Sequence, residues 1–213
     1  MRLEVRTLSE QIFSVIRDRI VAGKVPPDLA IRQEALASEF GCSKIPLREA
    51  LARLEQEGLV ISQANRGFFV RPLSAEEAED IYALRLKIEP DAVGEAARRA
   101  NDADRAAARA ALDATIERSD GIGRLNRAFH LALVRPASRR ISARMIERLH
   151  ILSERYVLKH LEPTGRAGRA SGEHEKILAA WMAGDSDSAT KLSRRHIAQT
   201  LADLRRQFAA ENR

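Results

Sequence analysis

The hydrophobic and polar positions of this chain follow two patterns that meet near residue 73. Between residues 33 and 71, apolar residues first recur at helical spacing in two short segments and then alternate in two shorter ones. From residue 74 to residue 213 the chain is rich in alanine, leucine and arginine and keeps a helical period, without a convincing strand. The pattern therefore predicts a mixed N-terminal domain over residues 1–73 and an all-helical C-terminal domain over residues 74–213.

The N-terminal pattern predicts two short helices separated by a tight turn. Ala35, Leu36 and Phe40 form an apolar stripe on the first helix, and Gly41 fits the sharp exit at its end. Ser43 can cap the second helix. Three leucines of the second helix recur at spacings of four and three residues and are expected to face a core: Leu47, Leu51 and Leu54.

Two short segments, residues 60–63 and 68–71, then predict a β-hairpin whose turn ends at Gly67, where a positive φ is expected. Helix, turn, helix and hairpin in this order predict a winged helix-turn-helix. Lys44 and Arg48 lie one turn apart on the second helix, and Arg66 lies at the tip of the hairpin. Such cations suit major-groove reading and phosphate contacts. Periodicity alone favours DNA binding only slightly over a generic α+β interaction module.

Composition agrees with a polyanionic partner. The 213 residues carry a net charge of +6, which favours association with nucleic acid. Residues 1–73 hold 11 Lys and Arg against 9 Asp and Glu, a net of only +2, so the basic DNA-binding surface must be local. Aromatic residues make up only 4% of the chain, which argues against a base-stacking platform for RNA or single-stranded DNA.

The same composition predicts a cytoplasmic protein. Cys42 is the only cysteine, which excludes an internal disulfide and fits a reducing compartment; its position at the helix-helix turn favours a small buried residue over a redox sensor. The sequence shows neither a signal peptide nor an apolar run of membrane-spanning length. No membrane partner is expected.

The C-terminal domain is predicted to contain six helices. Pro72 stiffens the exit from the hairpin, and Ser74 to Glu77 form a capping-box pattern that starts a new helix at once. Pro90 is expected to kink this first helix. Breaks between the helices are expected near residues 101–102, 120–121, 136–138, 163–165 and 184–185.

Three histidines of this domain are predicted to face its interior. His130 follows Asn126 by four residues on one helical face, His174 begins an apolar stripe, and His196 shares another. Each histidine alone is more often a hydrogen-bonded core residue than a ligand. Three on separate helices of one bundle instead favour a metal site. The remaining two, His150 and His160, do not share a helical face with other candidate ligands. They are expected to be ordinary residues without a role in a metal or ligand site.

Arg85, on the first helix of the bundle, has two interpretations that spacing alone does not separate. Its guanidinium can bind a ligand carboxylate with two parallel hydrogen bonds. It can equally be a surface residue paired with Glu89 one helical turn later.

Two motifs resemble a known family. The run CSKIPLREAL at residues 42–51, LExEGLV at 54–60 and the pair Arg66 and Gly67 closely resemble the signature of the GntR superfamily of bacterial transcription regulators. NxxFH at 126–130, HxxIL at 174–178 and a histidine twenty-two residues after His174 resemble its FCD branch, whose C-terminal domain is an antiparallel helical bundle. Six helices are typical of the shorter-bundle subgroup. The resemblance implies DNA contacts from Ser43, Lys44, Arg48, Arg66 and Gly67.

The resemblance also implies a divalent metal and an effector. Many members of the branch bind the metal through an aspartate and three histidines, so the implied ligands here are Asn126, His130, His174 and His196, with the asparagine at the aspartate's position. Zinc, nickel and manganese all remain open. Arg85 lies in a stretch that borders the ligand cavity in family members, which favours a role in effector binding.

Two departures from the family pattern concern DNA. Lys44 occupies a position often held by arginine, and Glu34 occupies one where many relatives carry a DNA-contacting arginine. Lysine lacks the planar fork that suits guanine, so direct readout is expected to depend more on Arg48.

The sequence thus predicts a homodimeric transcriptional repressor that binds pseudo-palindromic double-stranded operator DNA. A small organic acid is the expected effector, because a divalent ion among neutral imidazoles and a neutral Asn126 needs a compensating charge. One alternative is a metal-dependent hydrolase fused to a DNA-binding head, with Glu173 or Glu175 as general base; helical direction is expected to turn both away from the His174 face. Another is a regulator whose bundle only dimerises.

Overall fold

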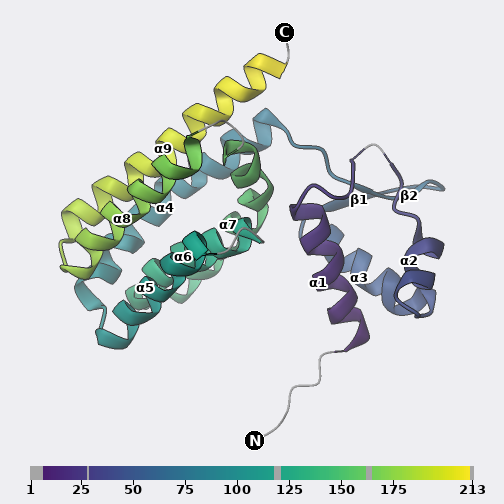
Figure 1. The fold of residues 1–213 in the computed structure, drawn as a ribbon, viewed down its shortest axis with the longest axis horizontal. Helices are drawn as coiled ribbons and strands as arrows, with labels where there is room; N and C mark the ends of the chain where they lie inside the picture. The colour runs from purple at the N-terminus through teal and green to yellow at the C-terminus, as the bar shows by residue number, and fades with distance from the viewer. Residues whose placement is uncertain (1–6, 28, 118–120, 162–164, 212–213) are drawn as a thin grey trace, which may run out of the picture. The chain divides into compact units, whose positions relative to one another are not determined.

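The computed structural model describes residues 7–27, 29–117, 121–161 and 165–211, and the chain divides into two compact units, residues 1–72 and 73–213 (Figure 1). Among the described residues, the first unit holds three helices and a two-stranded sheet, and the second is helical. The predicted fold class, mainly α with a winged helix-turn-helix followed by an all-helical bundle, is confirmed.

The first unit begins with α1 (Leu8–Val21), which precedes the stretch that predicted the winged helix-turn-helix. Thr7 and Glu10 form a capping box at its start: Thr7 Oγ1 accepts from Glu10 N at 3.2 Å, and Glu10 Oε2 accepts from Thr7 N at 3.0 Å. Its buried face packs against α3 and contributes Ile12, Phe13, Ile16, Ile20 and Val21 to the core of the unit.

The next two helices are α2 (Gln33–Glu39) and α3 (Lys44–Gln56). The three leucines predicted to face the core from α3 are fully buried. The predicted stripe on α2 is partly wrong: Ala35 is exposed, and Ala37 is the buried residue of this helix. Leu36 and Phe40 pack against the core as expected. Gly41 has φ +59°, which suits the sharp exit from α2.

The wing is an antiparallel hairpin of β1 (Val60–Gln63) and β2 (Gly67–Val70). Val60 pairs with Val70, and Gln63 pairs with Gly67, so the second strand begins one residue earlier than predicted. Gly67 has φ +91°, which lets the chain turn and enter the strand at the same residue. Phe69 also forms a bridge to Ala30, which ties the wing to the segment before α2.

The second unit contains α4 (Ala75–Arg99), α5 (Asp102–Glu117), α6 (Ile122–Val134), a 3-10 turn η1 (Arg135–Ala137), α7 (Arg140–Leu161), α8 (Arg166–Met182) and α9 (Ser186–Glu211). The long helices α4 and α9 lie side by side, and α4 also contacts α6, α7 and α8 (Figure 1). Pro90 lies inside α4 without ending it. Among the described residues, no helix is both long enough and apolar enough to cross a membrane.

The start of α4 departs from the predicted capping box. Ser74 Oγ accepts from Glu77 N at 3.3 Å, which is the expected half of the motif. In the other half of the motif, the Glu77 side chain would accept from Ser74 N. A tyrosine of α7 intervenes instead: Ser74 N donates to the Tyr156 hydroxyl at 3.1 Å, and that hydroxyl donates to Glu77 Oε2 at 2.7 Å. A buried tyrosine therefore anchors the first residues of the helical unit.

Small residues let α4 and α9 approach closely. A Cβ added at Gly94 would lie 3.0 Å from the carbonyl oxygen of Ser186 and would clash with the Thr190 hydroxyl. Glycine is therefore required here for space and not for backbone freedom.

A buried tryptophan connects α8 to α6. Trp181, fully buried, donates from Nε1 to the Leu133 carbonyl at 3.0 Å and fixes α8 against α6.

Candidate functional site

The exposed start of α3 carries the residues predicted to contact DNA. Ser43 occupies the position before the helix, but its side chain makes no capping hydrogen bond. Lys44 and Arg48 are exposed and line a shallow surface hollow together with Arg32. Lys44 Nζ lies 2.7 Å from Glu34 Oε1, so the acidic residue that departs from the family pattern partly neutralises the first cation. Arg48 is left as the stronger positive group of the pair.

A residue that sequence reasoning missed lies between these two cations. Ile45 is 70% exposed, on the same helix that buries the side chains of Leu47, Leu51 and Leu54. It is three residues before Arg48 and so lies next to it on the helix surface. Exposed apolar side chains on a groove-reading helix can contact the methyl group of thymine.

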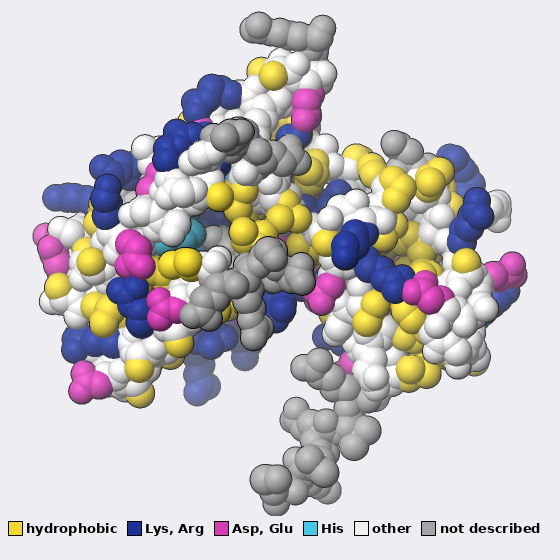
Figure 2. Space-filling model, viewed as in Figure 1, with side chains coloured by type: hydrophobic (Ala, Val, Ile, Leu, Met, Phe, Trp, Pro, Cys, Tyr) yellow, Lys and Arg dark blue, Asp and Glu magenta, His cyan; other side chains and the backbone are white. Residues whose placement is uncertain are grey.

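The tip of the wing presents Arg66. The side chain is exposed, and its guanidinium lies 5.3 Å from the centre of the Phe69 ring. Gly67 follows directly and has no side chain to block a close approach to its backbone. In the view of Figure 2, Lys and Arg side chains are distributed over both units and do not gather in one large patch.

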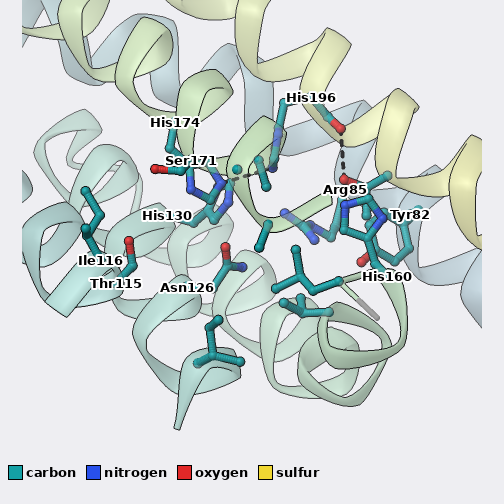
Figure 3. Close-up of a pocket in the computed structure, with 17 residues that line it drawn as sticks. Tyr82, Arg85, Thr115, Ile116, Asn126, His130, His160, Ser171, His174 and His196 are labelled. Atoms are coloured by element: carbon teal, nitrogen blue, oxygen red, sulfur yellow. Dashed lines mark hydrogen bonds between the residues drawn. The ribbon is translucent and has the colours of Figure 1, made fainter. Parts of the chain in front are cut away.

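In the helical unit, the three histidines predicted to act together lie side by side. His130 on α6, His174 on α8 and His196 on α9 are all buried, with ring centres 4.7 to 5.4 Å apart (Figure 3). The Nε2 atoms of His174 and His196 lie 3.3 Å apart. All three residues can offer one nitrogen within 4.8 Å of the others.

A carboxylate lies behind two of these three rings. His130 Nδ1 is 3.0 Å from Glu89 Oε1, and His196 Nδ1 is 2.7 Å from Glu173 Oε2. An ionised carboxylate only accepts hydrogen bonds, so each Nδ1 carries a proton, and in the neutral form of the ring Nε2 is the nitrogen with the free lone pair. The expectation that Glu173 turns away from the histidines is therefore wrong: its side chain reaches His196 from the residue just before His174. Glu175 does turn away and pairs with Arg109 at 3.0 Å.

Arg85 and His150 complete a second buried cluster around Glu89. Arg85 Nε and Nη2 donate to Glu89 at 2.8 and 3.2 Å, and His150 Nε2 lies 3.1 Å from Glu89 Oε1. The pairing with Glu89 that spacing allowed does form, but Arg85 is not at the surface, because it is only 2% exposed. The expectation that His150 is ordinary is also wrong: it is a buried partner of this carboxylate.

The charges in this second cluster are balanced. Burial alone would raise the pKa of Glu89, but Arg85 and the two imidazoles hold that pKa well below its usual range. Glu89, His130 and His150 have the right donor atoms for a metal. The guanidinium of Arg85 already occupies both carboxylate oxygens and would repel a cation. The cluster is therefore better suited to fixing His130 than to holding an ion.

The His130, His174 and His196 set fits a divalent metal better. Burial, neighbouring imidazoles and Arg85 hold the pKa of His174 well below its ordinary value, and burial lowers the pKa of His130 to about 3. Both rings are therefore neutral, as a metal ligand must be. Two nitrogens bound tetrahedrally to zinc at about 2.0–2.1 Å lie about 3.3–3.4 Å apart, close to the separation of the His174 and His196 nitrogens. Among the described residues, His130 Nε2 is buried without a hydrogen-bond partner.

These nitrogens face a cavity of about 290 Å³ inside the helical unit. Arg85, Tyr82 and His160 lie at one end of it, and Asn126 lines its wall (Figure 3). His160, expected to be ordinary, is therefore part of the cavity lining. In the space-filling view, histidine atoms are visible at the surface of the helical unit (Figure 2).

Comparison with known proteins links both units to one class. Residues 8–70 match the family described as bacterial regulatory proteins, gntR family, and residues 80–199 match the FCD domain. The chain is 30% identical to the HTH-type transcriptional regulator BphR of Paraburkholderia xenovorans, over 94% of this chain and 86% of that protein. It is also 30% identical to the HTH-type transcriptional repressor GlaR of Escherichia coli, over 85% and 89% of the two chains.

The fold agrees with solved structures. The chain superposes on E. coli McbR/YncC with a TM-score of 0.79, covering 96% of this chain and all of the other, at 23% sequence identity. At this identity the likeness concerns the fold alone. The relatives found by sequence are transcriptional regulators, and the two matched segments correspond to the two compact units.

Proposed function

Because the chain belongs to the gntR family of bacterial regulatory proteins and carries an FCD domain, and is therefore a DNA-binding transcriptional regulator, we propose how its activity is controlled. It acts as a homodimeric repressor in the cytoplasm. Its helical unit holds a divalent ion at His130, His174 and His196, with Asn126 nearby. A small organic acid binds at that ion and releases the protein from its operator.

One observation carries this proposal: three buried imidazoles converge on a cavity that also contains an arginine. Separate helices supply His130, His174 and His196, which fits a site assembled by the fold. A cavity of about 290 Å³ leaves room for a molecule of a few carbon atoms. A divalent ion held here would supply positive charge and open coordination positions for an acid.

The charges around the cavity favour an anion over a neutral ligand. Arg85 uses Nε and Nη2 for Glu89, which leaves donors on Nη1 for a molecule in the cavity. Burial raises the pKa of Tyr82 to about 12, so its hydroxyl keeps its proton and can donate as well. A carboxylate that meets an ion at one end and these donors at the other is held at two points. A neutral sugar lacks the compensating charge.

Coupling to DNA binding would pass through α4. This helix carries Arg85 and Glu89 in its middle, and only two residues separate its start at Ala75 from the end of the first unit at Pro72. Tyr156 on α7 holds the start of the same helix. The two DNA-binding units of the dimer can be at the spacing that fits the operator or at another spacing. An acid that contacts Arg85 can release operator DNA only if it binds more tightly to the second arrangement than to the first.

Metal analysis and thermal shift test the site. Protein purified without chelator should contain about one divalent ion per chain, and His174→Ala should lose most of it, because two imidazoles are too few strong ligands. Small hydroxy acids should raise the melting temperature of the metal-loaded protein, whereas neutral sugars should not. Wild-type protein that neither contains nor responds to divalent ions would instead favour a bundle that only dimerises.

The geometry of Glu173 does not favour the alternative function, a metal-dependent hydrolase. Glu173 contacts the Nδ1 side of His196, opposite the Nε2 atom that faces the cluster. A general base must reach the water or substrate bound at the open position. Glu173 is therefore better placed to hold a histidine than to activate water.

A further inference from the structure

The histidine cluster contains a carboxylate whose charge is not accounted for by the site described above. None of the proposed direct ligands, three imidazoles and the Asn126 amide, brings a negative charge, and the charge of Glu89 is balanced by the bidentate Arg85. Glu173 is different. Its side chain is 25% exposed, and its Oε2 atom accepts from His196 Nδ1 at 2.7 Å.

We propose that Glu173 is a positioning residue for the metal site: it holds His196 in the Nδ1–H form and supplies, through that ring, the negative charge that the direct ligands lack. This inference rests on the proposed metal site. A carboxylate that accepts from the far nitrogen of a ligating imidazole orients the ring and makes the near nitrogen a better donor. Asn126 then needs to contribute only a neutral oxygen.

The local geometry gives Glu173 this role and gives Glu175 none. Glu173 comes directly before His174 on α8, so one turn of one helix supplies both a candidate ligand and the partner of the neighbouring ligand on α9. Glu175 lies directly after His174 and pairs instead with Arg109 at 3.0 Å. The two glutamates share a helix, a side-chain type and partial exposure, and differ in what they contact.

Glu89 provides an internal comparison. It holds His130 at 3.0 Å in the same way that Glu173 holds His196, but it is completely buried and bound to Arg85. The chain therefore backs two of the three rings with carboxylates, one of them fully buried at Glu89 and the other partly exposed at Glu173. A change at Glu173 can test the charge without disrupting the buried core.

The matched pair Glu173→Gln and Glu175→Gln tests this role. Glutamine keeps an oxygen that can accept from His196 but removes the charge. Zn²⁺ affinity, measured by competition with a chromophoric chelator, should fall about 10- to 100-fold in Glu173→Gln and stay within about twofold of wild type in Glu175→Gln. Circular dichroism and the melting temperature of the metal-free proteins show whether both variants are folded.

A second measurement reads the tautomer directly. In metal-free wild-type protein, long-range ¹⁵N–¹H spectra of the histidine rings should show His196 protonated at Nδ1. A His196 ring protonated at Nε2, or a Glu173→Gln variant that binds Zn²⁺ as tightly as wild type, would overturn the assignment to Glu173. Wild-type protein that binds no divalent ion would instead overturn the proposed metal site itself, so the two failures are distinguishable.

Discussion

Replacing Arg85 by methionine should destabilise the helical unit far more than removing an exposed arginine of similar geometry. Arg85 donates through two nitrogens to Glu89, whose side chain is completely buried. Methionine fills much of the same space but leaves the carboxylate with only its two imidazole partners. Removing one member of a buried ion pair typically costs about 3–5 kcal/mol. We expect a loss in that range for Arg85→Met at neutral pH.

Arg205 provides the matched control. It also makes two contacts to a glutamate, Glu79, but its side chain is 59% exposed. Exposed ion pairs contribute about 0–1 kcal/mol, so Arg205→Met should lose no more than that. The double variant Arg85→Met, Glu89→Gln should recover at least about half of the Arg85→Met loss, because it no longer buries an uncompensated charge.

Urea unfolding in the presence of chelator, followed by tryptophan fluorescence, measures these differences. Trp181 is the only tryptophan of the chain and is fully buried in the helical unit, so its signal reports on that unit. A loss for Arg85→Met as small as that for Arg205→Met would refute the reasoning. It would mean that the buried pair contributes no more than a surface one.

Three further predictions concern DNA, pH and packing. Arg48→Ala should reduce discrimination between operator and unrelated DNA, whereas Arg66→Ala should weaken binding to both; unchanged affinity and salt dependence in both variants would contradict these roles. Burial, with Arg166 and His196 nearby, lowers the pKa of His160 to about 4, so as the pH falls from 6.5 to 5 only the unfolded state gains this proton, and His160 alone should cost the metal-free protein about 1–2 kcal/mol of stability. The lowered pKa values of His130 and His174 add losses of the same sign, so the total loss should exceed that of a His160→Gln variant by this amount; equal losses in the two proteins would be evidence against it. Gly94→Ala should destabilise the protein by about 1–3 kcal/mol, because the added methyl group clashes with α9. Helix propensity alone would give the opposite sign, a gain of about 1 kcal/mol. A higher melting temperature in this variant would show that α9 moves to accommodate the methyl group.

Helical periodicity was sufficient to predict features that belong to a single helix, such as its buried face and its ends. The leucines of α3 and the breaks near residues 101–102, 136–138 and 184–185 follow directly from apolar spacing and from glycine, proline and polar clusters. The breaks expected near residues 120–121 and 163–165 fall on or beside residues 118–120 and 162–164, which lie outside the described part of the chain. Ala35 and Ala37 could not be distinguished in the same way, because α2 has only seven residues and too few apolar positions to define a face. The helix α1 precedes the winged helix-turn-helix motif of residues 33–71 and was not predicted. The capping-box residues Thr7 and Glu10 were the signal that could have identified its start.

The histidine cluster was predictable in part for the same reason. His130, His174 and His196 each continue an apolar face, and inward faces of packed helices meet. The partners of these rings were not predictable. An arginine and a glutamate four residues apart usually form a surface pair, and only the packing of α4 between its neighbours buries Arg85 and Glu89.

Side-chain length explains the remaining misjudgement. Glu173 precedes His174, and adjacent residues of a helix point about 100° apart, which suggested opposite environments. A glutamate is long enough to reach a neighbouring helix from the edge of the buried face, and His196 on α9 lies within that reach. Sequence spacing gives the direction of a side chain but not the distance to the next helix.

The central claim is that an acid bound at the metal site releases DNA, and fluorescence anisotropy of labelled operator DNA tests it most directly. With metal-loaded protein, small hydroxy acids should lower the anisotropy to that of free DNA, and treatment with chelator should abolish this response. Asn126→Asp should bind metal more tightly and need more acid for the same release, because the added charge competes with the acid. Release only by neutral or cationic metabolites, or equal release by the acid after chelation, would contradict the account.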